Sequence, residues 1–310
     1  NAPPAAPAHH RLRLLDRDQS ILAFNERVLD WARRPDVPLL ERLRYLCIVS
    51  SNLDEFFEVR AALHMAHVVA DAPGRERAPD PVAALWAKAH ALVEHQYALY
   101  NNELLPTLGR HHIHIVSHGE RTAAQRRWVK EYFEREVRPL LIPVGLDPAH
   151  PFPQVANKSL NFIVQLGGTD AFGRHNDIAI VKVPRVLPRV IRMPARVAEG
   201  KTLFVLLSSV IRAHLQDLFH GRQVGQFSQF RVTRNSDLAV DEEDVRNLRT
   251  ALRLGLQHRH YGQAVRLEVS ASCSEHLAGL LLAQFGLPHD ALYRVPGPVN
   301  LVRLQQMIDL

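Results

Sequence analysis

The chain has 310 residues, of which 46% are hydrophobic and 23% charged, and its formal net charge is +6. These proportions are those of a globular protein, and they exclude the disordered, collagen-like and coiled-coil classes. No run of 18 apolar residues occurs, so no transmembrane segment is predicted. At roughly 150 residues per domain, the length predicts about two domains. Cys47 and Cys273 are the two cysteines, which we expect to be buried thiols in a reducing compartment.

The first third of the chain has the apolar spacing of helices. Residues 1–11, rich in Ala, Pro and His, are predicted to form a disordered tail. Apolar residues then recur at intervals of three and four over residues 22–34, 39–70 and 81–105, with breaks at Pro35 and at Pro73-Gly74. Three such helices joined by short connections predict an antiparallel bundle over residues 12–116.

The pattern changes beyond residue 116. A loop or short strand is predicted at 111–118, and a helix at 122–136 with Thr122 as its N-cap. Strands are predicted at 160–166, 178–183, 203–207, 227–233 and 264–269, and further helices at 210–219, 244–256, 274–285 and 300–310. Strands interleaved with helices predict a mixed α/β domain over residues 117–310, so the fold class of the chain is α+β.

The basic charge belongs to this second part. Residues 117–310 hold 25 Lys and Arg against 18 Asp and Glu, whereas residues 1–116 hold 13 against 14. Nearly all the cations are Arg, whose planar guanidinium matches a phosphate or a carboxylate in two hydrogen bonds. A polyanionic partner and an ordinary solvated basic surface both fit this charge.

One segment partly matches a phosphate-binding loop. Residues 195–202 end in Gly200-Lys201-Thr202, but Ala195 stands where such a loop needs its first glycine. The residues that follow have the composition of a strand, whereas a phosphate-binding loop opens a helix. We therefore predict a turn before a strand.

The histidines and one acidic run suggest metal sites that the spacing does not support. No His-Glu-x-x-His motif and no close pair of cysteines completes a zinc site, so the clustered histidines are interpreted as loop and surface residues: His111, His112, His114, His258 and His260. The acidic residues 241–244 fit the start of a helix, with Asp241 as N-cap. No metal site is predicted in this chain.

Asn52 breaks a local rule. It lies with Ser50 and Ser51 in the middle of a strongly helical apolar pattern, where such residues reduce helix propensity. A polar residue in such a place indicates either function or a satisfied contact between helices. Because an amide has both a donor and an acceptor, it can bind the edge of an adenine through two hydrogen bonds. The residues alone leave both interpretations open.

Segments in order along nearly the whole chain resemble the type 1 polyphosphate kinases. In the first part they are Phe24-Asn25-Glu26-Arg27-Val28-Leu29, Pro38-Leu39-Leu40-Glu41-Arg42-Leu43, residues 50–57 and Val59-Arg60. In the second part they are residues 147–153, 158–161, 183–188, 230–238, 264–269 and 293–301. Matches in order along about residues 14–310 are far more specific than any single motif. One departure is Asp18-Gln19-Ser20-Ile21-Leu22, where the family usually has Glu-Leu-Ser-Trp-Leu.

The resemblance implies a spectrin-like three-helix bundle followed by the middle, or head, domain of that family. It implies an ATP:polyphosphate phosphotransferase, a cytoplasmic phosphoprotein that reversibly transfers the terminal phosphate of ATP to inorganic polyphosphate through a phosphohistidine. It further implies a homodimer, with a peripheral membrane location as an alternative. Mg²⁺ is expected to act in the intact enzyme without being bound by this part.

The resemblance also implies roles for particular residues. The Asn before Leu-Asp-Glu, which is Asn52 here, contacts the adenine of ATP in this family. The phosphorylated histidine lies in two further domains of the family, so no catalytic residue is assigned in this chain, which alone is expected to be inactive. From the basic charge of residues 117–310 we predict that Arg231 and Arg234 face polyphosphate.

Two other functions remain open. The chain could be a non-catalytic module that binds polyphosphate or dimerises. A nucleic-acid-binding protein would also explain a basic second part. The chain lacks basic strands interleaved with aromatic residues and any recognition-helix pattern, so no nucleic-acid partner is predicted.

Overall fold

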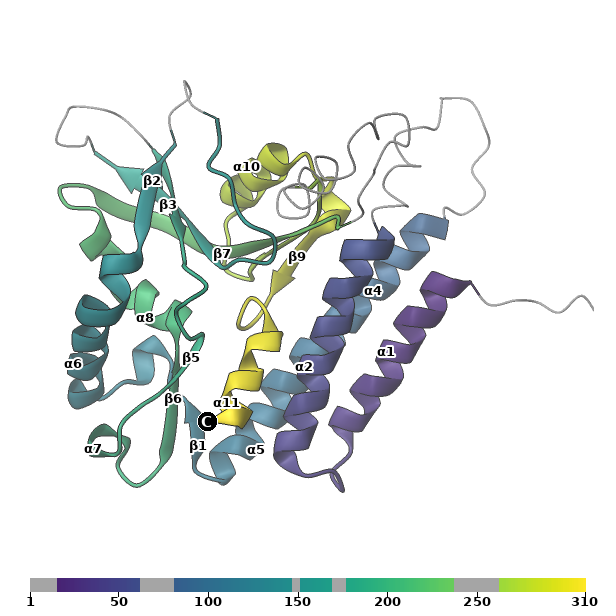
Figure 1. The fold of residues 1–310 in the computed structure, drawn as a ribbon, viewed down its shortest axis with the longest axis horizontal. Coiled ribbons are helices and arrows are strands. Elements are labelled where there is room, and N and C mark those ends of the chain that lie inside the picture. The colour runs from purple at the N-terminus through teal and green to yellow at the C-terminus, as the bar shows by residue number, and fades with distance from the viewer. Residues whose placement is uncertain (1–15, 62–80, 147–150, 169–176, 237–261) are drawn as a thin grey trace, which may run out of the picture.

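The computed structural model describes residues 16–61, 81–146, 151–168, 177–236 and 262–310 (Figure 1). Helices come first along the chain, and strands mixed with helices follow, which confirms the predicted α+β fold. No helix within these segments is long and apolar enough to cross a membrane. Cys47 and Cys273 are both buried free thiols, as predicted.

The first part of the chain is a three-helix bundle. Its helices are α1 (Arg17–Arg33), α2 (Leu39–Phe56) and α4 (Pro81–Leu99). A π-helical turn, Phe57–Ala61, continues α2, and another, Tyr100–Leu104, joins α4 to α5 (Leu105–Arg110). Asp16 caps α1 by accepting a hydrogen bond of 2.9 Å from the backbone N–H of Gln19. Residues 62–70 of the second predicted helix lie outside the described residues.

The apolar spacing of the sequence becomes the core of this bundle. Leu22 and Leu29 of α1 are completely or almost completely buried, as are Leu43, Leu46 and Leu53 of α2. Within each helix these positions are three or seven residues apart and therefore lie on one face of the helix. Their burial is the main source of stability in this region, since each buried leucine contributes about 1.5–3 kcal/mol.

A six-stranded sheet forms the upper layer of the second part in Figure 1. Its strands lie in the order β2 (Ile142–Gly145), β4 (Ile178–Lys182), β3 (Asn161–Gly167), β7 (Gln223–Arg234), β8 (Ala264–Ser270) and β9 (Leu292–Val295). All neighbours are antiparallel except β8 and β9, which are parallel.

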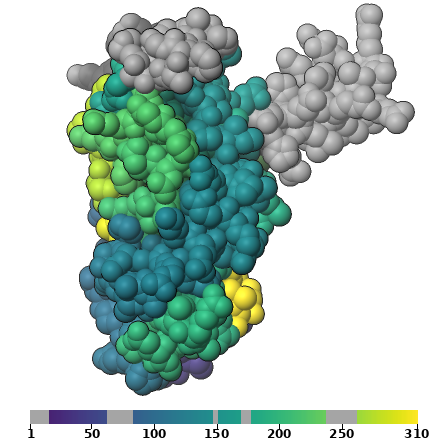
Figure 2. Space-filling view, turned by 90° about the vertical axis from the view of Figure 1, so that its left-hand side faces the viewer, coloured from purple at the N-terminus to yellow at the C-terminus, as the bar shows by residue number. Residues whose placement is uncertain are grey.

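Alternate residues of this sheet enter two different cores. In β3, Phe162 and Val164 pack with Val129 and Phe133, which lie on and directly after α6 (Ala123–Tyr132). Ile163, between them, faces the opposite side and joins the core formed with α10 (Glu275–Phe285). The period of two in a strand therefore gives the sheet one helical layer on each face. Figure 2 shows the α6 region covering the middle of the face that lies at the left in Figure 1.

A second, three-stranded sheet has the order β1 (Ile113–Ile115), β6 (Thr202–Leu206) and β5 (Val190–Arg192). Strand β1 directly follows the bundle and pairs in parallel with β6, so the two parts of the chain share a sheet. The last residues, a 3-10 turn Leu301–Leu304 and α11 (Gln305–Asp309), pack between β5 and α2 (Figure 1). Leu301 and Leu304 belong to the same core as Leu43 and Leu46.

Several element boundaries differ from the predictions. The helix predicted at 210–219 is α8 (Leu207–Ala213) followed by a 3-10 turn, Gln216–Leu218. It ends at His214, which leaves the helical conformation while its ring stacks on Phe133 at 4.7 Å. The segment predicted as a helix at 300–310 is half 3-10 and half α-helix. The predicted helix at 244–256 lies outside the described residues, and the division at residue 116/117 stays a prediction.

Candidate functional site

Helix α2 carries the candidate residue Asn52 and, two positions later, Asp54. The helix begins after Pro38, which suits a helix start because its ring fixes φ and it lacks an N–H. Asn52 is half-buried beside α1, whereas Asp54 is buried against the six-stranded sheet. Because residues two apart point to nearly opposite sides of a helix, α2 uses one polar residue on each side.

Asn52 is held by a second asparagine. Its Nδ2 donates a hydrogen bond of 2.8 Å to Oδ1 of Asn25 on α1. Asn25 is only 1% exposed, and its own Nδ2 donates to the backbone oxygen of Ile21 at 3.0 Å. In the part of the chain that the structure describes, no hydrogen bond reaches Oδ1 of Asn52. The side chain of Asn52 therefore joins α2 to α1 through its Nδ2 and still has Oδ1 as an acceptor that no described residue uses.

Apolar side chains lie on the solvent-facing surface of this helix. Ile48, one turn before Asn52, and Val59, in the π-helical turn, are each 38% exposed. Exposed Ile and Val beside a polar amide form a surface on which a flat, partly apolar ring could lie while its edge meets the amide. The base-contact role of Asn52 stays a prediction.

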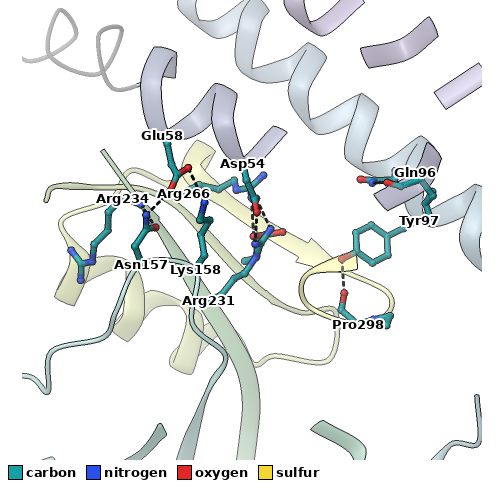
Figure 3. Close-up of polar contacts among 12 residues, drawn as sticks. Asp54, Glu58, Gln96, Tyr97, Asn157, Lys158, Arg231, Arg234, Arg266 and Pro298 are labelled. Atoms are coloured by element: carbon teal, nitrogen blue, oxygen red, sulfur yellow. Dashed lines mark hydrogen bonds and ion pairs between the residues drawn. The ribbon is translucent and has the colours of Figure 1, made fainter. Parts of the chain in front are cut away.

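Asp54 fastens α2 to the sheet. Its two oxygens accept hydrogen bonds from Nη1 and Nη2 of Arg231 at 2.9 and 2.8 Å, and Oδ1 also accepts one from Nη2 of Arg266 at 2.5 Å (Figure 3). Glu268 completes the cluster by pairing with Nε of Arg231 and, at 3.0 Å, with Nη2 of Arg266. The buried cluster thus holds two carboxylates and two guanidinium groups, and its formal charges balance.

The charges in this cluster control its pKa values. Burial by itself would raise the pKa of Asp54, but the nearby charges of Arg231 and Arg266 more than offset it, so that pKa lies below its ordinary value. For Arg231, burial favours the neutral form, yet Asp54 and Glu268 together raise its pKa above the ordinary value. Asp54 and Arg231 therefore both stay charged at neutral pH.

The prediction for Arg231 is corrected by this geometry. Its side chain is 1% exposed, and all three nitrogens of its guanidinium face Asp54 or Glu268. A side chain placed in this way cannot also extend toward polyphosphate in solvent. Arg231 does bind anionic groups, but these groups are the carboxylates of Asp54 and Glu268 in the same chain.

Arg234 lies at the end of the same strand and is half-buried. Its Nη1 donates to the backbone oxygen of Gly262 at 2.8 Å, its Nε donates to that of Val155 at 3.3 Å, and its guanidinium lies over the ring of Phe285. The role predicted for Arg234 toward polyphosphate stays a prediction.

A second set of contacts joins the same helix to the loop before β3. Glu58, in the turn after α2, accepts hydrogen bonds from Nδ2 of Asn157 at 2.5 Å and from Nζ of Lys158 at 2.8 Å (Figure 3). Asn157 Oδ1 in turn accepts from the backbone N–H of Arg234 at 2.9 Å. The end of α2 is therefore fixed at two points, by Asp54 to β7 and β8 and by Glu58 to the loop before β3.

Sequence reasoning assigned no role to Asp54, Glu58, Arg266 or Glu268. One signal for two of them lay in β8, where Arg266 and Glu268 alternate with apolar residues in a strand whose other positions are all apolar up to Val269. Such alternation usually marks a solvated face. Here all six of these positions are buried, and the charges are explained by partners on other elements, Asp54 on α2 for Arg266 and Arg231 on β7 for Glu268.

The weaker motifs are placed as turns and surface residues. Residues 195–198 form the short helix α7 (Ala195–Ala198), Glu199 adopts the left-handed conformation, and β6 follows, which confirms a turn before a strand. His111 and His112 are exposed, and His114 lies in β1. His258, His260 and the acidic run at 241–244 lie outside the described residues. Among the described residues, no three His, Cys, Asp or Glu side chains are placed to share a metal ion.

Comparison with known families decides the identity of the chain. The family model for the polyphosphate kinase middle domain matches residues 124–307, and that for the polyphosphate kinase N-terminal domain matches residues 14–116. The chain belongs to the polyphosphate kinase family. It is 51% identical over 306 residues to a polyphosphate kinase of Neisseria gonorrhoeae, and 49% identical over 295 residues to one of Pseudomonas syringae pv. tomato.

These relatives of the family are longer than the present chain. The alignments cover 96% and 94% of this chain but only 44% and 40% of the two relatives, so the chain spans less than half their length. The crystal structure of polyphosphate kinase from Porphyromonas gingivalis superposes with a TM-score of 0.76 at 24% sequence identity. It covers 94% of this chain and 40% of the solved one, and this likeness concerns the fold.

Proposed function

We propose that this chain is the amino-terminal and middle part of a homodimeric polyphosphate kinase and that Asn52 contacts the adenine of ATP. In the proposed reaction, a histidine nitrogen attacks the terminal phosphorus of ATP and releases ADP. The phosphohistidine then passes its phosphoryl group to the terminal oxygen of polyphosphate, and the reverse sequence regenerates ATP. The reacting histidine and the Mg²⁺ ligands are assigned to parts of the enzyme outside these 310 residues.

The observation that carries the proposal for Asn52 is its contact with Asn25. Nδ2 of Asn52 donates to a buried, fixed acceptor, which sets the rotation of the amide, and its Oδ1 receives no hydrogen bond from the described residues. An amide oriented before the nucleotide arrives loses less side-chain freedom on binding. Its second N–H and its Oδ1 together supply the donor and acceptor that an adenine edge requires.

The rigid attachment of α2 supports the same role. Asp54 and Glu58 fix the end of the helix to β7, β8 and the loop before β3. A base held by a fixed helix is one way to keep the distant terminal phosphate in line for attack, because positioning is a large part of phosphoryl-transfer catalysis. Asn52 is thus a substrate-binding residue, while Asp54 and Glu58 position its helix.

The experiment is steady-state kinetics of the intact enzyme carrying Asn52→Ala, with Ser51→Ala as the matched control. Ser51 is the exposed neighbour on the same helix. Loss of hydrogen bonds to the base is expected to raise the KM for ATP about tenfold, while the control changes it less than about twofold. An Asn52→Ala enzyme that folds normally and keeps the KM for ATP would return Asn52 to a purely structural contact.

A further inference from the structure

A pocket lies where the end of the chain meets both sheets. It contains about 480 Å³ of empty space, including its open mouth. Polar side chains from five parts of the chain line it: Lys158, Arg189, Ser208, Gln229, Arg231, Asn300 and Arg303. The remaining lining is apolar, and it includes Leu160, Leu206 and Leu304. The pocket is therefore a separate place from the Asn52 surface, which lies on the α1 side of the bundle.

The charges around this pocket do not balance. Four of its lining residues are cations, and none is Asp or Glu. Two of the four have acidic partners elsewhere, because Lys158 pairs with Glu58 and Arg231 with Asp54. Arg189 and Arg303 form no ion pair with any residue in the described segments. Two positive charges are thus left facing one concave space.

Of the two arginines, Arg189 gives the stronger evidence for an anion site. It is only 9% exposed, and its Nη1 has no hydrogen-bond partner among the described residues. Nη2 makes one long contact of 3.4 Å with the backbone oxygen of Val183. A buried guanidinium without a carboxylate is costly, so structures rarely contain one unless a ligand completes it.

The pKa values of the two arginines agree with an anion site. Burial, followed by the positive charges of Arg303 and Arg185, lowers the pKa of Arg189 to about 10. The pKa of Arg303 is also lowered, first by burial and then by Arg185 and Arg231. Like charges that repel each other in this way attract an anion more strongly than separate surface cations do.

A side chain near the end of the chain, Gln306, holds the backbone beside the pocket in place. Oε1 of Gln306 accepts hydrogen bonds from the backbone N–H groups of Arg189 and Val190, at 2.8 and 3.1 Å. Asn300 has a positive φ of 86°, and its Oδ1 is buried without a partner in the described structure. Rotation of this terminal amide by 180° would turn its N–H groups to where Oδ1 now lies. The pocket thus combines two guanidinium groups that form no ion pair in the described segments with an Asn300 amide that can present either its oxygen or its N–H groups.

We infer that this pocket binds a phosphate group, with Arg189 and Arg303 as its ligating cations. A phosphate oxygen would accept a hydrogen bond from Nη1 of Arg189, and the exposed Arg303 would bind the same phosphate group from the rim of the pocket. The inference rests on the proposed function only for the natural source of the phosphate, which would be polyphosphate. The chemistry at the pocket is shared by free orthophosphate and by the end of a condensed phosphate chain.

The test is calorimetric titration of the 310-residue chain with orthophosphate and with tripolyphosphate, without ATP. The variant Arg303→Gln changes an exposed residue, and the control Arg196→Gln removes the same charge from exposed α7. We expect saturable binding that Arg303→Gln weakens about tenfold and Arg196→Gln less than about twofold. Arg189→Gln should weaken it at least as much, and if that variant fails to fold, Arg303→Gln carries the test alone.

The outcomes separate the possible ligands. Tighter binding of tripolyphosphate supports the end of a chain as the ligand, and equal binding supports a single phosphate group. The inference is overturned if no saturable binding occurs, if Arg303→Gln and the control Arg196→Gln weaken binding equally, or if citrate competes as well as phosphate. Because ATP is absent from the titration, such a failure leaves the kinetic result for Asn52 untouched, and the two proposals fall separately.

Discussion

The carboxylate of Asp54 on α2 and the guanidinium of Arg231 on β7 are 177 residues apart in the sequence and meet in two hydrogen bonds, of 2.8 and 2.9 Å, inside the protein. Arg266 and Glu268 extend this pair into a buried cluster with no net charge. The cluster lies at the junction of the helical bundle and the sheet, two residues from Asn52. It therefore links the position of the candidate base-binding residue to the second part of the chain.

Asp54→Asn is expected to destabilise the protein strongly. The change leaves Arg231 and Arg266 buried with Glu268 as their single carboxylate, and breaking a buried pair from one side costs about 3–5 kcal/mol. Asp30→Asn is the matched control, because Asp30 pairs with Arg33 on the surface of α1 and such pairs contribute at most about 1 kcal/mol. Urea unfolding of the three proteins measures both values, and a loss for Asp54→Asn no larger than that for Asp30→Asn would contradict the role of the cluster.

The pH dependence of stability should carry the signature of Asp54. Its pKa in the folded protein lies below the ordinary value, so between the two values the unfolded state binds more protons than the folded state. Its stabilising contribution is then complete above the unfolded pKa of about 3.9 and is lost as the pH falls through the folded pKa.

The measurement is the free energy of unfolding of the wild type and of Asp54→Asn, from pH 7 down to pH 3. We expect the difference between the two proteins to be constant from pH 7 to about pH 5 and to shrink below about pH 4. A difference that stays constant to pH 3 would mean that Asp54 does not titrate as its arginine neighbours require.

Gly297 should not accept a side chain. A Cβ at this position would lie 3.1 Å from two ring atoms of Tyr97, and that ring is held by a hydrogen bond of 2.6 Å from its hydroxyl to the backbone oxygen of Pro298. Because Tyr97 is buried and fixed, we expect Gly297→Ala to cost about 1–3 kcal/mol of unfolding free energy. Gly279→Ala, on the exposed side of α10 with no atom within 4 Å, should instead be neutral or stabilising by up to about 1 kcal/mol. Thermal unfolding of both variants tests this, and equal effects would refute the steric argument.

The sequence predicted most of the regular elements because their signals are local. Strands β3, β4, β6, β7 and β8 are runs of β-branched and aromatic residues, and Thr122 and Ser274 cap α6 and α10 by accepting hydrogen bonds from the backbone three residues on. The missed strands β2, β5 and β9 have only three or four residues each. Such short runs become strands only because a longer neighbour pairs with them, and the sequence does not show that neighbour.

Only part of the candidate site could be predicted from the sequence, because several of its residues depend on partners in distant elements. Asn52 could be found because it breaks the pattern of its own helix. Arg231 was found too, but its burial depends on Asp54, and no spacing rule connects residues in different elements at that separation. The same holds for Arg189, which nothing in its neighbouring sequence distinguishes from a surface arginine. Its burial follows from the packing of residues 299–307 against β5.

The role that we propose for Asn52 is recognition of the nucleotide base by its side-chain amide. The most direct measurement is the ratio of kcat/KM for ATP to kcat/KM for GTP, in the intact enzyme and in its Asn52→Ala variant. We expect the wild type to prefer ATP and the variant to show an about tenfold smaller ratio, because GTP does not make the adenine contacts that the substitution removes. An unchanged ratio in a folded, active variant would contradict it.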